Sequence, residues 1–299
     1  MKKTVQTIMM IILATSGAVS SFSASSADTL APLTMDAGLH AQLPDHIKVN
    51  KTLNLVTDAH YPPCESFADD NKTMVGFEPD LWDALGKVLG VTVKPVSIDF
   101  SGLIPGVKSS RYDVAMECIS DSLEREKQVT FVNYAYATSE VYTLANEASI
   151  KADPLTLCGQ KVGVQTGTDF EAAIRKIYIP ECTKNSREPV QVVILPSADA
   201  VLLALYSGRV DFVLNDAASV DEIKKKAPKP IRTLTMPLMP KYYLGIVVAH
   251  ENQQLAEVLL KALQVLHKTG HYDAIMDKWD LTPMKLPEPG INLTSTHPL

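Results

Sequence analysis

Arg125 and Asp216 are the two charged residues whose sequence surroundings best suit them to hold a small charged molecule. Arg125 ends the segment Asp-Ser-Leu-Glu-Arg, where a capping residue opens a helical turn whose N–H groups point the same way. A guanidinium can hold a carboxylate through two parallel hydrogen bonds, and its charge persists at neutral pH. Asp216 follows Val-Leu-Asn, an apolar run that turns polar as a strand does at its exposed end. Together the two residues could satisfy both charges of a zwitterion.

Each of the two residues also has a purely structural interpretation. Arg125 could be a surface residue paired with Glu124 or Glu126, and such exposed pairs contribute little. Asp216 could do no more than cap the helix predicted to begin near Ala217. Which interpretation holds depends on where the surrounding elements place these side chains.

The elements that must position these residues are short strands alternating with amphipathic helices. Apolar residues recur at helical spacing in residues 77–88, before Gly90, and in residues 255–266, before Gly270. This alternation predicts right-handed βαβ units and mostly parallel sheets, whose ligands bind outside the carboxyl ends of the strands. The strand candidates are residues 53–57, 91–96, 113–116, 162–165, 190–195 and 211–214.

A weak internal repeat relates two helix–turn–strand units at a constant offset. The same offset pairs Cys118 with Asp216, so both are expected just past a strand end, one in each half. The match predicts two equivalent strand ends that face each other across a cleft, although such units share this pattern and could match by coincidence. The paired positions are Leu103 with Val201, Val107 with Leu205, Arg111 with Arg209 and Asp113 with Asp211.

The chain begins with a segment typical of a secretory signal peptide, residues 1–27. Two lysines precede an apolar run, residues 8–14, and small residues follow as far as Ala27. The run is interrupted and is shorter than the ~20 residues that a membrane anchor needs. No cysteine follows until Cys64, which argues against a lipid anchor. We therefore expect an exported protein that is processed after Ala27.

Composition and motif content exclude several classes of function. The net charge of −6 is spread without blocks, which argues against nucleic acid or an anionic membrane as the partner. The sequence has no metal-ligand cluster, no nucleophile elbow and no phosphate-binding loop beyond Gly167 and Thr168, so we expect no cofactor and no enzyme activity. The roughly 270 residues left after processing suggest two compact lobes.

The four cysteines of an exported chain are disulfide candidates, with three possible connectivities. Cys158 and Cys182 flank a predicted strand and helix, so we predict a bridge that clips this unit together. Cys64 and Cys118 are expected near each other at the cleft, either bridged or free, because a bridge needs Cα atoms within about 7 Å.

Five short motifs follow one another between about residue 51 and residue 279. They are Thr-Asp-Ala-His-Tyr-Pro-Pro (57–63), Val-Gly-Phe-Glu-Pro-Asp-Leu (75–81), Gly-Leu-Ile-Pro (102–105), Arg-Glu-Lys-Gln-Val (125–129) and Gly-Val-Gln-Thr-Gly-Thr (163–168). Each motif alone is weak, whereas their order and spacing are specific. The set resembles the periplasmic polar-amino-acid-binding proteins of ABC transporters, which are family 3 solute-binding proteins.

The resemblance implies a type II periplasmic binding protein fold. In that fold two α/β lobes, each a mostly parallel sheet flanked by helices, are joined by two crossing strands. Lobe one is expected to comprise residues 50–138 and 244–285, and lobe two residues 139–243. The resemblance further implies a monomer in the periplasm that closes around a small amino-acid-like ligand and delivers it to the permease of an ABC transporter.

A set of ligand-binding residues is also implied by the resemblance. Tyr61 matches an aromatic that stacks on the ligand, Phe100 stands where the family often has Trp, and Ser120 matches a hydroxyl that bonds the ligand. The structural alternatives are packing within its own loop for Tyr61, the core for Phe100 and a turn for Ser120. Arg125 would grip the ligand carboxylate and Asp216 its ammonium. The full set is Asp58, Tyr61, Phe100, Glu117, Cys118, Ser120, Arg125, Gly167, Thr168, Asp169 and Asp216.

The segment after Gly167 departs from the family pattern. Thr168 and Glu171 have capping-box spacing, which predicts a helix start with free N–H groups, where the family binds the ligand carboxylate. Asp169 stands where the family usually has Ser or Thr. It could merely complement the helix dipole, but it would repel a carboxylate if it faced the cleft.

The ligand expected from these residues is cationic or rich in donors. Asp58, Glu117, Asp169 and Asp216 outnumber Arg125 among the charged candidates, which favours arginine, lysine, ornithine, histidine or a related amine. Some members of this fold resemble cyclohexadienyl dehydratases, which gives an alternative function. If burial raised its pKa, Glu117 could be the acid of such an enzyme.

Overall fold

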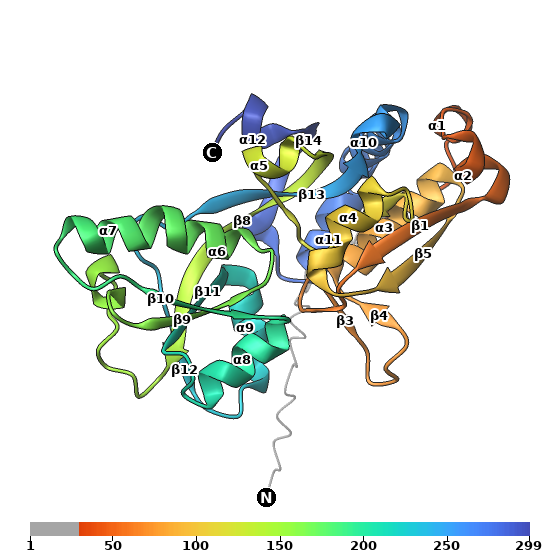
Figure 1. Ribbon diagram of the computed structural model, residues 1–299. Helices are drawn as coiled ribbons and strands as arrows, with labels where there is room; N and C mark the ends of the chain where they lie inside the picture. The colour runs from red at the N-terminus through yellow and green to blue at the C-terminus, as the bar shows by residue number, and fades with distance from the viewer. Residues whose placement is uncertain (1–29) are drawn as a thin grey trace, which may run out of the picture. The chain divides into compact units, whose positions relative to one another are not determined.

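The structure is a computed structural model that describes residues 30–299 (Figure 1). The predicted signal peptide, residues 1–27, lies outside the described residues. No helix in the described part of the chain is long and apolar enough to cross a membrane. Residues Pro32–Leu299 form one contact unit, and the fold described below is the fold of that unit.

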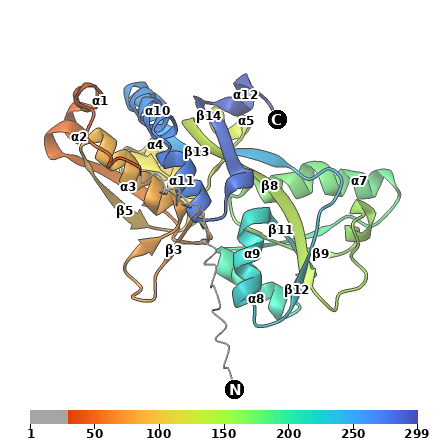
Figure 2. The same ribbon diagram turned by 180° about the vertical axis from the view of Figure 1, so that it is seen from behind.

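The six predicted strand segments form two groups of parallel strands, and Figure 2 labels β5 of the first group and β9 and β11 of the second. In the first group, β1 (Thr52–Thr57) pairs with β5 (Thr92–Ser97) and β6 (Val114–Ala115). In the second group, β9 (Lys161–Gln165) pairs with β10 (Gln191–Leu195) and β11 (Phe212–Asp216). These strand predictions are confirmed, with boundaries that differ by at most two residues.

Two long strands absent from the sequence predictions link the two groups. β8 (Val129–Leu144) and β13 (Lys241–Ala249) pair antiparallel with each other. β13 also pairs with β6 of the first group, and β8 with β11 of the second group, both antiparallel. The order across the sheet is β10-β9-β11-β8-β13-β6-β1-β5. Most of β8 is buried on both faces, so apolar and polar residues do not alternate along it and its period was not visible. The expected parallel pairing therefore holds within each group, and antiparallel pairs enter through β8 and β13.

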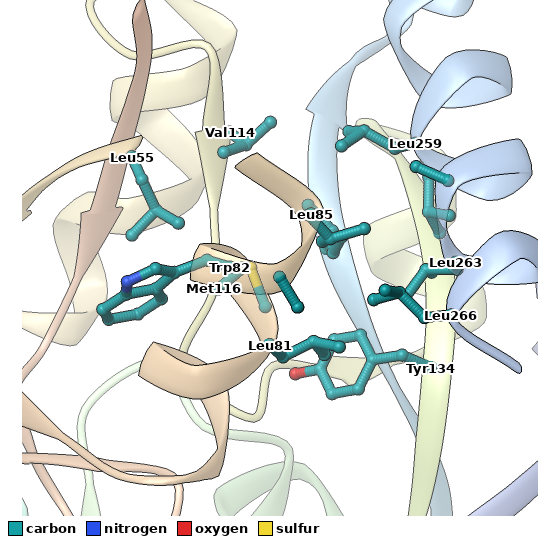
Figure 3. Close-up of a cluster of buried hydrophobic side chains, with 14 of the residues drawn as sticks. Leu55, Leu81, Trp82, Leu85, Val114, Met116, Tyr134, Leu259, Leu263 and Leu266 are labelled. Atoms are coloured by element: carbon teal, nitrogen blue, oxygen red, sulfur yellow. The ribbon is translucent and has the colours of Figure 1, made fainter. Parts of the chain in front are cut away.

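Both predicted long helices are present. Helix α3 (Phe77–Leu89) ends at Gly90, which adopts the left-handed conformation that glycine tolerates best. Helix α10 (Gln253–Lys268) packs against α3. Leu81 and Leu85 of α3 lie with Leu263 of α10 and neighbouring side chains in one buried cluster (Figure 3).

The other elements are shorter. The remaining helices are α1 (Ala37–Ala41), α2 (Asp45–Asn50), α4 (Leu103–Lys108), α5 (Leu123–Glu126), α6 (Asp169–Ala173), α7 (Ile179–Lys184), α8 (Ala198–Tyr206), α9 (Ala217–Lys226), α11 (His271–Lys278) and α12 (Leu293–Thr296). A π-helical turn (Ile174–Tyr178) joins α6 to α7. The remaining strands are β2 (His60–Tyr61), β3 (Glu65–Phe67), β4 (Met74–Val75), β7 (Ser120–Asp121), β12 (Ile231–Leu234) and β14 (Lys285–Ile291).

Buried apolar residues form four clusters that separate along the sequence. Two clusters draw their buried members from residues 39–137 and 244–284. The other two draw theirs from residues 141–236 alone. The chain thus builds one set of cores from its two ends and another from its middle.

The internal repeat is confirmed by equivalent hydrogen bonds in its two copies. The Asp113 N–H donates to the Asn54 carbonyl oxygen (2.9 Å), and Asp113 Oδ2 accepts from the Asn54 N–H (2.8 Å). Asp211 makes the same two contacts with Lys161, at 2.8 and 2.7 Å. Each Asp therefore ties the turn after a helix, α4 or α8, to the first strand of its own parallel group.

Both cysteine pairs are bonded. Cys158 is bonded to Cys182 with their Cα atoms 5.5 Å apart, which confirms the predicted bridge. Cys64 is bonded to Cys118 with a Cα separation of 6.0 Å, which settles the alternative left open by the sequence.

Candidate functional site

A cavity of about 410 Å³ lies at the carboxyl ends of strands from both parallel groups. Tyr61 follows β1, Glu117 follows β6, and Gln165 and Asp216 end β9 and β11. The cavity therefore occupies the place that parallel α/β topology predicts for a ligand. Eight of the predicted site residues line it: Tyr61, Phe100, Glu117, Cys118, Ser120, Thr168, Asp169 and Asp216.

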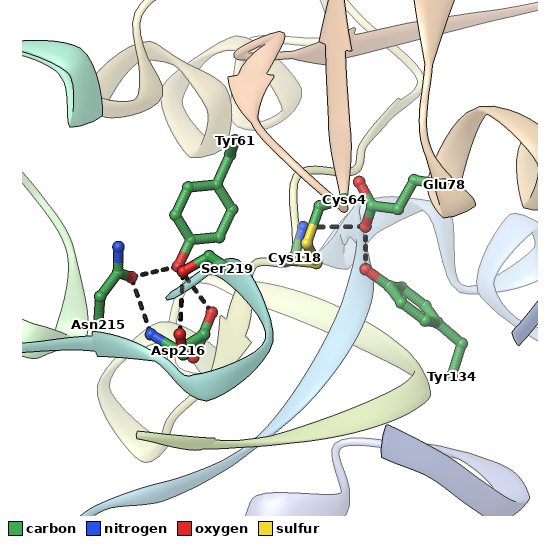
Figure 4. The surroundings of a disulfide bond; sticks show 8 residues. All are labelled: Tyr61, Cys64, Glu78, Cys118, Tyr134, Asn215, Asp216 and Ser219. Carbon is green, nitrogen blue, oxygen red and sulfur yellow. Dashed lines mark hydrogen bonds between the residues drawn. A yellow bond between two sulfur atoms is a disulfide. The ribbon is translucent and has the colours of Figure 1, made fainter. Parts of the chain in front are cut away.

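Tyr61 reaches across the cavity to the end of β11 (Figure 4). Its hydroxyl lies 2.9 Å from Asp216 Oδ2 and also contacts Asn215 Oδ1. Asn215 Oδ1 in turn accepts the Asp216 backbone N–H at 2.9 Å. Tyr61 therefore does not merely pack within its own loop.

Asp216 stands at the start of α9, but its side chain makes no cap hydrogen bond there. The interpretation of Asp216 as a helix cap alone is therefore wrong. Burial raises the pKa of Asp216 to about 7, and the hydrogen bond from Tyr61 opposes part of that rise. The carboxyl would gain from a cation placed beside it, because a nearby positive charge stabilises its ionised form.

Arg125 is buried, and its interpretation as a surface residue paired with Glu124 or Glu126 is wrong. Its Nη1 donates to the carbonyl oxygen and to Oγ of Ser120, both at 2.7 Å, and its Nη2 donates to the carbonyl oxygen of Gly167 at 2.9 Å. The guanidinium also lies against the Phe100 ring, with Cζ 5.6 Å from the ring centre.

Asp169 completes the surroundings of Arg125. Its Oδ2 lies 3.0 Å from Arg125 Nη1 and accepts the Ser120 hydroxyl at 2.8 Å. Asp169 therefore does more than complement the dipole of α6. Its carboxylate neutralises the one arginine that the sequence singles out for a ligand carboxylate.

The capping box predicted after Gly167 does not form, although α6 begins at Asp169 as expected. Thr168 Oγ1 turns back and donates to the Gln165 carbonyl oxygen at 2.8 Å. Glu171 instead pairs with Arg175, one helical turn ahead, at 2.9 Å. Each side chain has a nearer partner than the helix-start N–H groups, which explains why the pattern failed.

Asp58, Arg125 and Gly167 are predicted site residues that do not line the cavity. Asp58 is buried beside it and accepts from His60 Nδ1 (2.9 Å), from the Phe100 N–H (3.2 Å) and from Gln165 Nε2 (3.2 Å). Its charge is thus satisfied by three protein donors.

Glu117 lies on the cavity wall, and its carboxyl has no hydrogen-bond partner among the described residues. It is 4% exposed, and it makes no hydrogen bond to any other residue in the range 30–299. Its pKa is raised well above its usual value, first by burial and then by the charges of Asp58, Glu78 and Asp216, with Arg125 opposing them. A donor from a bound molecule would satisfy it.

The neighbouring Cys118 is held from two sides (Figure 4). The disulfide ties it to Cys64, and its N–H donates to Glu78 Oε1 at 2.9 Å. Glu78 Oε1 also contacts the Tyr134 hydroxyl. This framework fixes the turn that presents Glu117.

Several cavity residues were not identified from the sequence. Gln165 and Asn215 are polar residues at the ends of strands β9 and β11, and this position was the available signal. Tyr142 belongs to β8, which was not predicted, and Phe170 has the spacing of a core residue, three positions before the buried Ala173 of α6. Tyr206 is the last residue of α8, and no sequence signal distinguished it. Among the described residues, no group of three or more His, Cys, Asp or Glu side chains is placed to hold a metal ion.

Known proteins resemble this chain over most of its length. The family model of the bacterial extracellular solute-binding proteins, family 3, matches residues 53–282. The putative ABC transporter arginine-binding protein 2 of Escherichia coli (strain K12) is 34% identical over 232 residues, which cover 77% of this chain and 90% of that protein. These relatives are binding proteins of transporters rather than enzymes.

Solved structures agree with this assignment. An ancestral arginine-binding protein bound to arginine has a TM-score of 0.69 and 32% identity, covering 77% of this chain and 98% of that chain. The ancestral amino acid-binding protein AncCDT-1, a precursor of cyclohexadienyl dehydratase, has a TM-score of 0.69 and 26% identity, covering 79% and 98%. The fold is the mixed α/β fold of type II periplasmic binding proteins. The chain belongs to the bacterial extracellular solute-binding proteins, family 3.

Proposed function

We propose that the mature chain is a periplasmic binding protein that carries a cationic, amino-acid-like solute to the permease of an ABC transporter. The observation that carries this proposal is the acidic wall of the cavity, where the buried carboxyls of Glu117 and Asp216 both open onto the space. The arginine-binding function of the relatives supports a cationic solute. The volume of about 410 Å³ falls within the usual range of small-molecule pockets.

Two lobes would hold the solute between them. Lobe one comprises residues 50–138 and 244–285, and lobe two residues 139–243. The separate cores of the end segments and the middle segment support this division. β8 and β13 are the two strands that cross between the lobes, so closure would be a hinge motion about them.

Besides the contacts of Asp169 with Ser120, Ser122 and Arg125 and the contact of Tyr61 with Asn215, three hydrogen-bonded contacts join the proposed lobes around the cavity. They are Tyr61 to Asp216 at 2.9 Å, Gln165 to Asp58 at 3.2 Å, and Arg125 to the Gly167 carbonyl oxygen at 2.9 Å. Each contact needs both lobes in place, so the described conformation corresponds to a closed state. Processing after Ala27 would release this protein into the periplasm as a monomer.

The dehydratase alternative fits the charges of the cavity poorly. Its substrates, prephenate and arogenate, carry carboxylates, whereas Glu117, Asp216 and Asp169 are all on the cavity wall and Arg125 is already paired. The carboxylates of a bound substrate would be repelled by the carboxyl groups of the cavity wall rather than stabilised by them. Incubation with prephenate is therefore expected to yield no phenylpyruvate.

The experiment that tests the proposed function is calorimetry on the processed chain, residues 28–299, after unfolding and refolding to remove bound solutes. The titrants are arginine, lysine, ornithine, histidine and the amines derived from each, with glutamate and leucine as controls. At least one cationic titrant should bind about a hundredfold more tightly than either control, a difference of about 2.7 kcal/mol. Equal or tighter binding of glutamate or leucine would overturn the proposal.

A further inference from the structure

We infer that the solute of this cavity is an organic amine without a free α-carboxylate, and that Asp169 is the residue that excludes amino acids. The inference rests on the proposed function and narrows it. It comes from the pairing of Arg125, from the charges on the cavity wall and from the unpartnered carboxyl of Glu117.

Both terminal nitrogens of Arg125 already have partners within the protein. The two N–H groups of Nη1 face Ser120 and Asp169, and Nη2 donates to Gly167. The side chain of Arg125 is 7% exposed, and Arg125 is absent from the cavity wall, whereas Asp169 is part of that wall. A ligand carboxylate would have to displace Asp169 and leave its partly buried carboxylate (18% exposed) without its cation, which is unfavourable.

The start of α6 offers no substitute for Arg125. Asp169 is the first residue of α6, so the first turn of the helix already carries a negative charge. The hydroxyl of Thr168 is turned away to the Gln165 carbonyl oxygen. An incoming carboxylate would meet the negative charge of Asp169 at this point.

The rest of the wall attracts cations. Lys226 is the only lysine or arginine among the described residues that line the cavity, and it is exposed at the last position of α9. Glu117 is almost fully buried, with 4% of the residue exposed. Its carboxyl has no hydrogen-bond partner among the described residues. Asp216 is the second buried carboxyl. Both carboxyls line the same cavity, so one diamine or guanidinium-amine could reach both.

Aromatic side chains supply the apolar contact for the carbon chain of such an amine. Those that line the cavity are Tyr61, Phe67, Phe100, Tyr142, Phe170 and Tyr206. Their ring faces also attract ammonium and guanidinium groups. An aliphatic amine with a positive group at each end would therefore find both carboxyls and apolar contacts on this wall.

The first test compares molecules that differ only by the carboxylate. Calorimetry on wild-type residues 28–299 pairs agmatine with arginine, cadaverine with lysine, putrescine with ornithine, and histamine with histidine. In the pair that binds most tightly, the amine should bind at least about tenfold more tightly than its amino acid, which corresponds to about 1.4 kcal/mol. An amino acid that binds as tightly as its amine would overturn the inference and leave the proposed function intact. Absence of binding throughout the panel would overturn both.

The second test changes the preference for amine over amino acid by substituting Asp169. Asp169→Thr restores the residue type common in the family and releases Arg125, so affinity for the matching amino acid should rise at least tenfold and the preference for the amine should shrink. Glu171→Gln is the matched control, since it removes a negative charge from the same helix outside the cavity and should change neither affinity. Circular dichroism and a thermal melt establish that both variants are folded. A folded Asp169→Thr protein with an unchanged preference would show that Asp169 does not set the specificity.

Discussion

Asp216 should make solute binding depend on pH, because burial raises its pKa to about 7. A cationic solute needs the ionised carboxylate, so below that pH binding must displace a proton. The contribution of Asp216 should make affinity rise with pH up to about pH 7 and then level off, with a slope of about tenfold per pH unit for one proton. Glu117, whose pKa is also raised, should steepen the slope.

This pH dependence can be measured by titrating the most tightly bound amine at about five pH values between roughly 5.5 and 8.5. The Asp216→Asn variant should bind the amine more weakly, and the slope of its log affinity against pH should be smaller by about one unit. An affinity for the wild-type protein that stays constant over this range would contradict the role of Asp216.

Glu65 should lower stability as pH rises. It is fully buried, neither of its carboxylate oxygens has a hydrogen-bond partner in the described chain, and its pKa is raised well above its usual value by burial and then by Glu78. The folded state keeps a proton that the unfolded state releases above about pH 4.5, so the free energy of unfolding falls with rising pH by up to about 1.4 kcal/mol per pH unit.

Glu65→Gln should remove this contribution to the slope. Urea unfolding at about pH 5 and about pH 8 should show a smaller loss of stability in the variant than in the wild type. Glu257→Gln, on the exposed face of α10, is the control and should keep the wild-type slope. Parallel slopes for Glu65→Gln and wild type would mean that Glu65 holds no extra proton in the folded state.

At the scale of single residues, the sequence identified eight of the residues that line the cavity but not the directions of their side chains. Tyr61 and Asp216 were recognisable because each follows a predicted strand. The partner of Arg125 was not, because Asp169 lies 44 positions later and belongs to another element. Residue type and spacing constrain contacts within one element, whereas a contact between elements depends on the tertiary structure.

The two disulfides allow a matched comparison at the scale of elements. Cys64–Cys118 closes a separation of 54 residues and Cys158–Cys182 one of 24. In the chain-entropy model, removing them should cost about 4 and about 3.5 kcal/mol of stability, respectively. Chemical denaturation of the two double Cys→Ser variants measures both losses.

The two double Cys→Ser variants should differ more in their affinity for the preferred amine than in their stability. Cys118 lines the cavity beside Glu117, whereas Cys158 and Cys182 do not line it. Cys64→Ser/Cys118→Ser should therefore weaken binding of the preferred amine, and Cys158→Ser/Cys182→Ser should leave it unchanged in the folded protein. Equal binding by both variants would mean that the first bridge does not position the site.

The elements that the sequence predicted well are those with a visible period or a clear boundary. Helix α3 has apolar residues at helical spacing and a glycine at its end, and both features are decided locally. The long strands β8 and β13 have neither, because they lie in the middle of the sheet and are buried on both faces along most of their length. The connection between the two parallel groups therefore came from the family resemblance and not from periodicity.

At the scale of the whole binding unit, Tyr61 is the residue best placed to control closure. Its hydroxyl reaches Asn215 and Asp216 across the proposed lobe boundary. A bound amine would compete for the same carboxylate and would take over the bridging role. Closure of the free protein thus depends on a contact that the solute replaces.

Tyr61→Phe should open the free protein without preventing closure around the solute. Loss of one such hydrogen bond is worth about 1 kcal/mol, which lowers the ratio of closed to open molecules roughly fivefold. Small-angle scattering should report a larger radius of gyration for the free variant than for free wild type, and equal radii once the preferred amine is bound. Tyr243→Phe, which removes a hydroxyl that donates to the His297 carbonyl oxygen, is the control and should not change either radius. If free Tyr61→Phe and free wild type scatter identically, the Tyr61 contact does not hold the lobes together, and closure must depend on the other contacts between them, those of Gln165, Arg125 and Ser120.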